Sequence, residues 1–241
     1  MTSALCLHGW GYTRDVFSLL PLNPYFNEIA KPCLYKTASK HGDYSLNALA
    51  ESLSKNLQQD TVLFGWSLGG LVALNMLEKT DKIKAVILIA STPVFVNRSD
   101  WGLSIDENDF NDLKSLLMTR PEQAIKQFNL LTTLGEDKAR HSANKAKVFL
   151  SDVRHQPILQ AWLIELYKAD FRNVLSKLKT PTLMFFGERD HLIRLETVNN
   201  INNNFIETHV LNRCGHLPFI NQSKQMLEIT NQFLNKNKNG N

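Results

Sequence analysis

Short apolar runs recur along the chain and alternate with longer segments whose apolar residues stand three or four positions apart. The runs predict buried strands at 4–7, within 26–34, and at 62–66, 83–89, 182–186 and 207–211. The spaced segments predict helices at 15–20, 46–57, 68–77, 196–203 and 223–234. Strands that alternate with helices imply right-handed crossovers, and therefore an α/β fold with a mostly parallel central sheet flanked by helices. Residues 36–44 and 235–241 are polar, and we expect a loop and a frayed tail there.

The alternation stops between residues 97 and 167, where helical patterns follow one another without a strand. Four helices are predicted there, at 109–118, 121–131, 138–150 and 157–167. We therefore expect a helical lid, residues 97–167, inserted into a core formed by residues 1–96 and 168–241. Such a lid excludes water and shapes the substrate pocket. A second helical layer without a lid role is the alternative.

The run at 62–66 ends in Gly65-Trp66-Ser67-Leu68-Gly69 and continues directly into helix-forming residues. A G-x-S-x-G pattern between a strand and a helix is typical of a nucleophile elbow, a strained turn that exposes a serine hydroxyl above a sheet. Glycine suits both ends of this turn because a Cβ would meet the neighbouring strand or helix. An ordinary glycine-containing loop is the alternative, but the flanking strand and helix favour the elbow.

The apolar run at 4–7 leads into the glycine-rich stretch His8-Gly9-Trp10-Gly11. In serine hydrolases, such a loop after an early strand supplies one backbone N–H of the oxyanion hole, and the residue after the nucleophile supplies the other. We therefore predict that Trp10 and Leu68 donate these two N–H groups. A plain turn with a hydrogen-bonded histidine is the alternative for His8 and Gly9.

A serine becomes a nucleophile when a base removes its proton and an acid holds that base in the right tautomer. Ser67, Asp190 and His216 occur in the order nucleophile, acid and base, each just after a predicted strand. The carboxyl ends of parallel strands share one edge of a sheet, so we expect these catalytic residues to converge there. Glu188 is the competing acid, and the competing histidines are His41, His141, His155, His191 and His209.

The composition restricts the other classes of function. The chain has 241 residues, 43% of them hydrophobic, which fits one α/β domain with an insertion. A net charge of +4 is too small to indicate nucleic acid as a partner. The three cysteines, Cys6, Cys33 and Cys214, form no C-x-x-C pair, and no cluster has metal-ligand spacing, so we expect neither disulfide, metal nor cofactor. Without a signal peptide or a membrane-spanning run, we expect a cytoplasmic protein. We also expect a monomer.

With these motifs the chain resembles the α/β-hydrolase superfamily over nearly its whole length, and within it the pimeloyl-acyl-carrier-protein methyl ester esterases of biotin synthesis. The likeness rests on residues 8–11, 65–73, 90–93 and 128–135, on Phe95 and Trp101, and on the two motifs around Asp190 and His216. It implies an α/β-hydrolase fold and hydrolysis of the methyl ester of a pimeloyl chain carried on acyl carrier protein. It also implies that the substrate contacts Trp10, Ser67, Leu68, Phe128, Asn129, Leu130, Leu131, Thr132 and His216.

Two features depart from the family pattern, and one charged region fits it in part. The family usually has a strand hairpin before the H-G strand. Here the H-G strand starts at Ala4, so we expect a sheet without the two strands of that hairpin. The family's D-x-P-G-x-G-x-S stretch has no match in residues 31–45. Lid arginines hold the acidic carrier protein in the family. Here Arg140 fits one such position, and further positive charge comes from Lys126, Lys138, Lys145 and Lys147, although a solvated charged face is the alternative.

Three classes of function follow from these residues. The favoured one is a carboxylesterase that acts on an ester bound to acyl carrier protein. A general short-chain carboxylesterase, a thioesterase, a lactonase and a carbon–carbon bond hydrolase use the same kind of triad on the same scaffold. A non-catalytic ligand-binding protein of the same fold is the third class.

Overall fold

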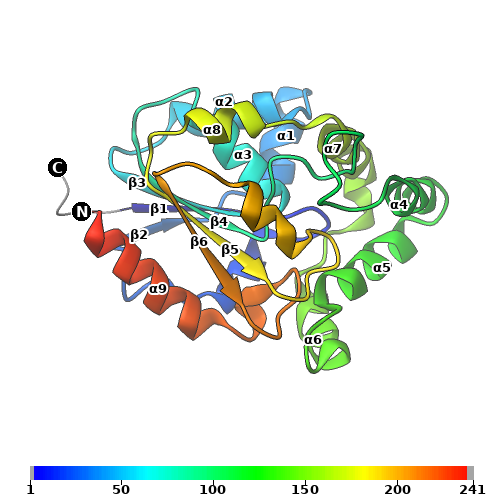
Figure 1. The fold of residues 1–241 in the computed structure, drawn as a ribbon. Helices are drawn as coiled ribbons and strands as arrows, with labels where there is room; N and C mark the ends of the chain where they lie inside the picture. Colours follow the sequence, from blue (N-terminus) through cyan, green and yellow to red (C-terminus); the bar gives the residue numbers. More distant parts are fainter. Residues whose placement is uncertain (1–2, 238–241) are drawn as a thin grey trace.

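The centre of the molecule is a single parallel sheet, seen in a computed structural model that describes residues 3–237 (Figure 1). Its strands are β1 (Ser3–Leu7), β2 (Glu28–Ala30), β3 (Thr61–Trp66), β4 (Ile83–Ile89), β5 (Thr182–Gly187) and β6 (Ile206–Leu211). They lie in the order β2-β1-β3-β4-β5-β6, and every neighbouring pair is parallel. The carboxyl ends of the strands therefore meet at one edge of the sheet.

Helices cover both faces of this sheet because both faces are apolar. Every residue of β1, β3 and β5 is buried. One face carries α1 (Leu34–His41), α2 (Leu46–Lys55), α3 (Leu68–Met76) and α8 (Arg172–Lys177), and the other carries α9 (Ser223–Lys236) (Figure 1). Helix α3 is buried along its whole length, which explains why its sequence is apolar on all sides.

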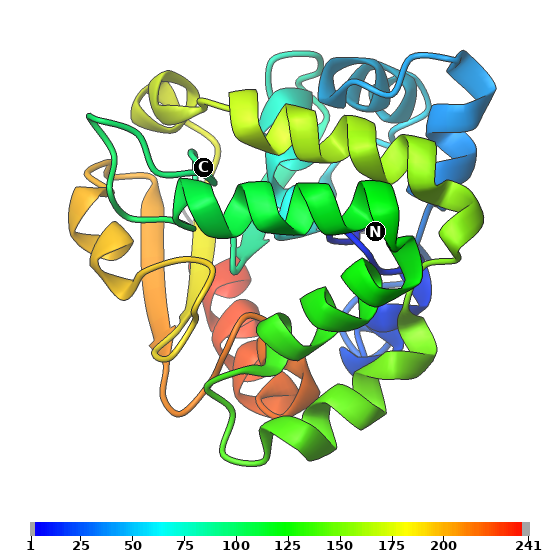
Figure 2. The ribbon, with the colours of Figure 1, turned by 90° about the vertical axis from the view of Figure 1, so that its right-hand side faces the viewer.

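The chain between β4 and β5 forms a group of helices beside the carboxyl edge of the sheet. We call the helices α4 (Glu107–Thr119), α5 (Pro121–Thr133), α6 (Ala139–Ala146) and α7 (Gln156–Lys168) the cap. Figure 2 looks onto the cap and shows α4 beside α7. The buried residues of α4, Phe110, Leu113 and Leu117, stand three and four positions apart and form one inward stripe.

Short 3₁₀ turns complete the described chain. They are η1 (Arg14–Leu19), η2 (Lys147–Phe149), η3 (Val153–His155), η4 (Leu195–Asn200) and η5 (Pro218–Ile220). The helices predicted at 15–20 and 196–203 are therefore 3₁₀ turns, and the helix predicted at 138–150 ends at Ala146. The predicted mostly parallel sheet is confirmed. The sheet formed by residues 3–237 contains no antiparallel pair, and β1 is its first strand along the chain.

The loop predicted at 36–44 is wrong, because residues 34–41 form α1. Leu34, Tyr35 and Ala38 are buried against the core, and this narrow stripe outweighs the polar character of the other positions. The sequence pattern also does not predict α8. The predicted tail begins too early, because α9 continues to Lys236, and residues 238–241 of that tail lie outside the described part of the chain.

Candidate active site

Ser67 lies in the sharp turn between β3 and α3, as the G-x-S-x-G pattern predicts. Its backbone has φ 53° and ψ −120°, outside the helical and extended regions. Its N–H donates to the carbonyl of Ile89, with an N–O distance of 2.9 Å, which ties the turn to β4. A Cβ on Gly69 would lie 2.0 Å from the Leu7 carbonyl oxygen, so the following helix approaches β1 where only glycine fits.

Ser67, His216 and Asp190 form one line of hydrogen bonds. The Ser67 Oγ lies 2.9 Å from His216 Nε2, and His216 Nδ1 lies 2.8 Å from Asp190 Oδ2. The imidazole and carboxylate side chains are 0% and 2% exposed. The other Asp190 oxygen accepts backbone N–H groups from Leu192 and Ile193, at 2.8 and 3.1 Å. An ionised Asp190 holds the proton on Nδ1, so that Nε2 is free to accept the serine proton.

The competing residues lie elsewhere. Glu188 accepts the backbone N–H of Arg213, with an O–N distance of 2.7 Å, and the structure does not bring it to His216. His155 stacks on Tyr35 with ring centroids 4.2 Å apart. The remaining histidines are the exposed His141 and His191, His209 against the Phe185 ring, and His41, whose side chain lies outside the described structure. The geometry therefore favours Asp190 and His216 among the candidates.

Two hydrogen bonds that the sequence motifs do not predict hold the elbow and the histidine loop. The indole Nε1 of Trp66 donates to the His216 carbonyl oxygen at 2.8 Å. The Ser91 hydroxyl donates to the Ser67 carbonyl oxygen at 3.0 Å. Trp66 and Ser91 both lie in stretches that carry the resemblance to the family, so this resemblance is the feature of the sequence that could have indicated them.

The loop that carries Trp10 passes directly beside the nucleophile. A Cβ on Gly9 would lie 3.2 Å from the Ser67 Cβ. The Trp10 indole Nε1 donates to the Leu159 carbonyl oxygen of α7 at 2.9 Å, so this loop is anchored to the cap. Leu68, the first residue of α3, presents its backbone N–H at a helix N-terminus, where such groups have no partner inside the helix. These two backbone N–H groups are the candidates for binding a negative oxygen.

A cavity of about 30 Å³ adjoins Ser67 and His216. Apart from these two residues its walls are apolar, and the cap supplies its roof through Phe110 and Leu113 of α4, Phe128 of α5, and Leu163 and Leu166 of α7. A neutral acyl chain fits such walls better than a charged group.

The structure brings one of the five predicted α5 residues to this cavity, namely Phe128. Asn129 and Thr132 instead contact the buried Tyr12 hydroxyl, with O–O distances of 2.8 and 2.7 Å. Burial raises the pKa of this hydroxyl, so it stays protonated and donates to the Asn129 side chain. Leu130 is 58% exposed, and Leu131 is partly buried against the core.

The predicted carrier-docking residues lie apart from one another. Lys138 and Arg140 line one open hollow at the start of α6. Lys145 reaches the last carbonyl of η5, with an N–O distance of 3.3 Å. Lys126 forms an exposed ion pair at 3.7 Å with a glutamate one turn earlier on α5. The structure thus brings together Lys138 and Arg140.

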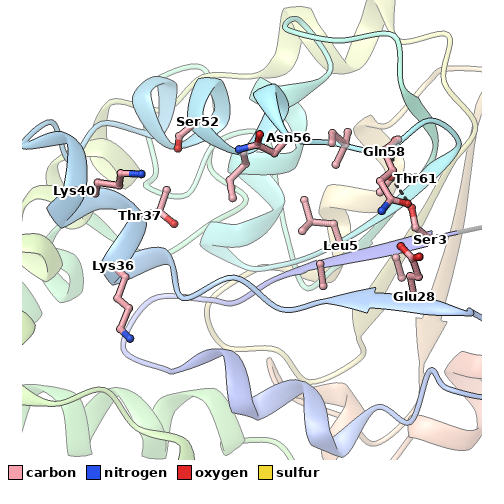
Figure 3. Close-up of a pocket in the computed structure, with 14 residues that line it drawn as sticks. Ser3, Leu5, Glu28, Lys36, Thr37, Lys40, Ser52, Asn56, Gln58 and Thr61 are labelled. Atoms are coloured by element: carbon pink, nitrogen blue, oxygen red, sulfur yellow. Dashed lines mark hydrogen bonds between the residues drawn. The ribbon is translucent and has the colours of Figure 1, made fainter.

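A larger cavity, of about 440 Å³, lies at the opposite edge of the sheet (Figure 3). Its walls include the first residues of three strands, Ser3, Glu28 and Thr61, and two lysines of α1 that Figure 3 shows. Ser67 follows the last residue of β3, so the length of the strands separates this cavity from the hydrogen-bonded line. The candidate site is therefore the smaller cavity.

Within residues 3–237, no group of three or more His, Cys, Asp or Glu side chains is arranged to hold a metal ion. No helix in the same range is both long enough and apolar enough to cross a bilayer. Cys6, Cys33 and Cys214 are free thiols, and burial raises the pKa of Cys6 to about 12.

Comparisons with known proteins agree with this fold. The family described as alpha/beta hydrolase fold matches residues 34–223. An esterase from Exiguobacterium antarcticum superposes with a TM-score of 0.78 at 17% identity, covering 98% of this chain and 92% of that one. A bromoperoxidase from Bacillus anthracis has the same TM-score at 16% identity, with 97% and 92% covered. These structures share the fold.

Two curated relatives share more of the sequence. A protein of Aeromonas salmonicida is 30% identical over 239 residues, which cover 95% of this chain and 93% of the relative. A protein of Photorhabdus laumondii is 27% identical over 238 residues, which cover 95% and 91%. Both are named pimeloyl-[acyl-carrier protein] methyl ester esterase. The chain belongs to the α/β-hydrolase fold family, as a relative of these named esterases.

Proposed function

We propose that the protein is a serine carboxylesterase that hydrolyses the methyl ester of pimeloyl-acyl-carrier protein. By its family and its relatives the protein is a carboxylic ester hydrolase. The observation that carries the proposal is the line of hydrogen bonds from Asp190 through His216 to Ser67, which opens onto an apolar cavity. The names of the curated relatives support the choice of substrate.

The proposed reaction begins with attack by the Ser67 hydroxyl oxygen on the ester carbonyl carbon, while His216 Nε2 takes the hydroxyl proton. The backbone N–H groups of Trp10 and Leu68 stabilise the negative charge that forms on the carbonyl oxygen. When the tetrahedral intermediate collapses, the methoxy oxygen takes the proton from His216 and leaves as methanol. The acyl group then remains bound to Ser67.

A water molecule completes the reaction by attacking the acyl carbonyl carbon as His216 removes one of its protons. The bond to Ser67 breaks, the serine oxygen takes that proton from His216, and the carrier-bound product leaves with a free carboxylate. Asp190 stays ionised throughout, holds the Nδ1 proton and stabilises the imidazolium that forms in each half of the reaction.

The cap acts as a lid in this proposal. The cavity beside Ser67 is small, about 30 Å³, and side chains of the cap form its roof. In this proposal the acyl chain enters when the cap helices move away from the core. The apolar side chains of α4, α5 and α7, among them Phe128, whose ring packs edge-on against Trp10, then line the methylene groups.

The basic residues at the start of α6 provide the docking site for the acidic carrier protein. Lys138 and Arg140 lie together there, and Lys126 and Lys145 add positive charge on neighbouring parts of the cap. Exposed charges of this kind accelerate encounter, and their effect weakens as salt is added.

The first experiment compares the wild-type protein with Ser67→Ala on purified pimeloyl-acyl-carrier-protein methyl ester. Methanol release and the mass of the carrier protein report which bond breaks. We expect the wild-type protein to release methanol and keep the thioester intact, and Ser67→Ala to be inactive while retaining its circular dichroism spectrum. Cleavage of the thioester would assign a thioesterase. Release of methanol by folded Ser67→Ala would refute the triad.

A second experiment tests the docking residues. Lys138→Glu/Arg140→Glu is expected to raise KM for the carrier-bound ester while KM for p-nitrophenyl butyrate stays unchanged. Growth without biotin of a bacterium that lacks its own pimeloyl ester esterase gives a cellular readout. Full restoration of growth by the doubly substituted protein at low expression would contradict the docking assignment.

A further inference from the structure

The loop that carries His216 is held by the cap as well as by the core. The carboxylate of Glu136, in the turn that follows α5, accepts the backbone N–H of Gly215, with an Oε1–N distance of 2.9 Å. Glu136 is 7% exposed, so this charged group is buried at the junction. Gly215 directly precedes His216, and the bond therefore fixes the peptide group that leads into the base.

The second oxygen of Glu136 also has a donor. Its Oε2 accepts from the Asn221 amide at 2.7 Å, and the same amide lies 3.0 Å from the Ser142 hydroxyl of α6. Among the ion pairs of residues 3–237, none joins Glu136 to a cation. Burying a carboxylate is unfavourable unless hydrogen bonds compensate it. An apolar side chain would fill this place without that penalty. The presence of a carboxylate is therefore explained by the hydrogen bonds that it accepts.

The same turn of the cap also touches the loop of the acid. Gly135 has φ +94°, and a Cβ there would lie 2.2 Å from the carbonyl oxygen of Arg189, the residue before Asp190. A Cβ on Gly215 would lie 2.5 Å from the Leu134 carbonyl oxygen. Backbone therefore meets backbone at both contacts. One short turn, residues 134–136, abuts the chain next to two members of the triad.

We propose that Glu136 is a positioning residue for His216, through which the cap holds the catalytic base in place. His216 keeps Nε2 directed at Ser67 Oγ while the turn at 134–136 is docked against the histidine loop. The inference rests on the proposed function, because it assumes that Ser67, His216 and Asp190 perform catalysis. A displacement of the imidazole by about 1 Å lowers the rate by about 100-fold.

Glu136→Gln tests this role with little change of shape. Gly215, Asn221 and the Cys214 thiol all donate toward the carboxylate, and the new amide has one oxygen where the carboxylate has two, so its NH₂ group must face one of these donors. We expect kcat for p-nitrophenyl butyrate, counted per serine that reacts with a fluorophosphonate probe, to fall about 10-fold to 100-fold, with KM changed less than about 2-fold. A merely structural role would lower the number of reactive serines and leave kcat per reactive serine unchanged.

Asp137→Asn is the matched control in the same turn. Asp137 is exposed, and its ion pairs with Arg189 and Arg213, at 3.2 and 2.5 Å, are open to solvent. Exposed ion pairs contribute little. We expect kcat per reactive serine to stay within about 2-fold of the wild-type value.

Glu136→Gln/Asn221→Asp tests whether the hydrogen bonds are the cause. In this variant the new amide oxygen accepts from Gly215, and its NH₂ group donates to the new carboxylate, which also accepts from the Ser142 hydroxyl. We expect recovery of kcat to within about 3-fold of the wild-type value. This double substitution also provides the test if Glu136→Gln alone does not fold.

Wild-type kcat per reactive serine in Glu136→Gln would overturn the proposal, as would a folded double variant that remains slow. If neither variant folds, Glu136 is a folding residue and the proposal is wrong. A wild-type protein that takes no fluorophosphonate label would overturn the triad together with this inference. A labelled protein that cleaves p-nitrophenyl butyrate but not the carrier-bound ester would refute the substrate assignment alone.

Discussion

Acidification should destabilise the fold through His8, a residue of the loop beside the nucleophile. Its side chain is fully buried, its Nδ1 lies 3.0 Å from the Gly9 carbonyl oxygen, and its ring stacks on Tyr35 with centroids 5.3 Å apart. Burial lowers the pKa of His8 from 6.5 to about 4. The folded protein therefore keeps this imidazole neutral at pH values where an unfolded chain would bind a proton.

The sign and size of the effect follow from this difference. Between pH 6.5 and about 4 the unfolded state binds more protons than the folded state, so lower pH favours unfolding. The stabilisation is complete above pH 6.5 and is lost as the pH falls to about 4. At about 1.4 kcal/mol for each pH unit, the free energy of unfolding should fall by about 3 kcal/mol.

Urea unfolding of the wild-type protein and of His8→Asn, from about pH 7 down to about pH 4, measures this term. Asparagine keeps an N–H donor for the Gly9 carbonyl oxygen but does not titrate. The variant should be less stable near pH 7, because the smaller side chain leaves a cavity, and the gap between the two proteins should close as the pH falls. His191→Asn, at an exposed histidine, is the control and should keep the wild-type slope. Parallel curves for wild type and His8→Asn would refute the reasoning.

Three further substitutions probe the site and its supports. Asp190→Asn should lower kcat for p-nitrophenyl butyrate about 10⁴-fold, because its NH₂ group favours the wrong tautomer of His216; a loss below about 10-fold would contradict this. Tyr12→Phe leaves its buried partners on α5 without the hydroxyl, so the melting temperature by calorimetry should fall by about 5 °C, and an unchanged value would show that water replaces it. Gly69→Ala would place a Cβ 2.0 Å from the Leu7 carbonyl oxygen, so we expect insoluble protein; soluble, fluorophosphonate-reactive protein would show that the turn can shift.

The parts of the site that the sequence predicts are those with a local signature. The glycines around Ser67 reflect a turn in which neighbouring residues decide the geometry. The order of Ser67, Asp190 and His216 is informative because parallel strands bring their carboxyl ends together, and the structure places these three side chains in hydrogen-bond contact.

The parts that the sequence does not predict depend on contacts between distant segments. Helix α1 looks polar along the chain, and burial of Leu34 and Tyr35 becomes visible only when the sheet is in place. The direction of Phe128 toward the cavity and of Leu130 toward solvent depends on how α5 is rotated against the core. The contact of Glu136 with Gly215 joins residues 79 positions apart, and no local pattern predicts it.

The apolar walls around Ser67 also affect how the reaction ends. The ester hydrolysis proposed for this cavity would produce a carboxylic acid, which ionises at neutral pH. Apart from Ser67 and His216, the residues that line the cavity are apolar, so its walls provide no cation to neutralise the new charge. Keeping an ionised carboxylate in such surroundings is unfavourable by several kcal/mol. In the proposed reaction this cavity therefore accepts a neutral ester better than it retains the ionised product, which favours rapid release and weak product inhibition.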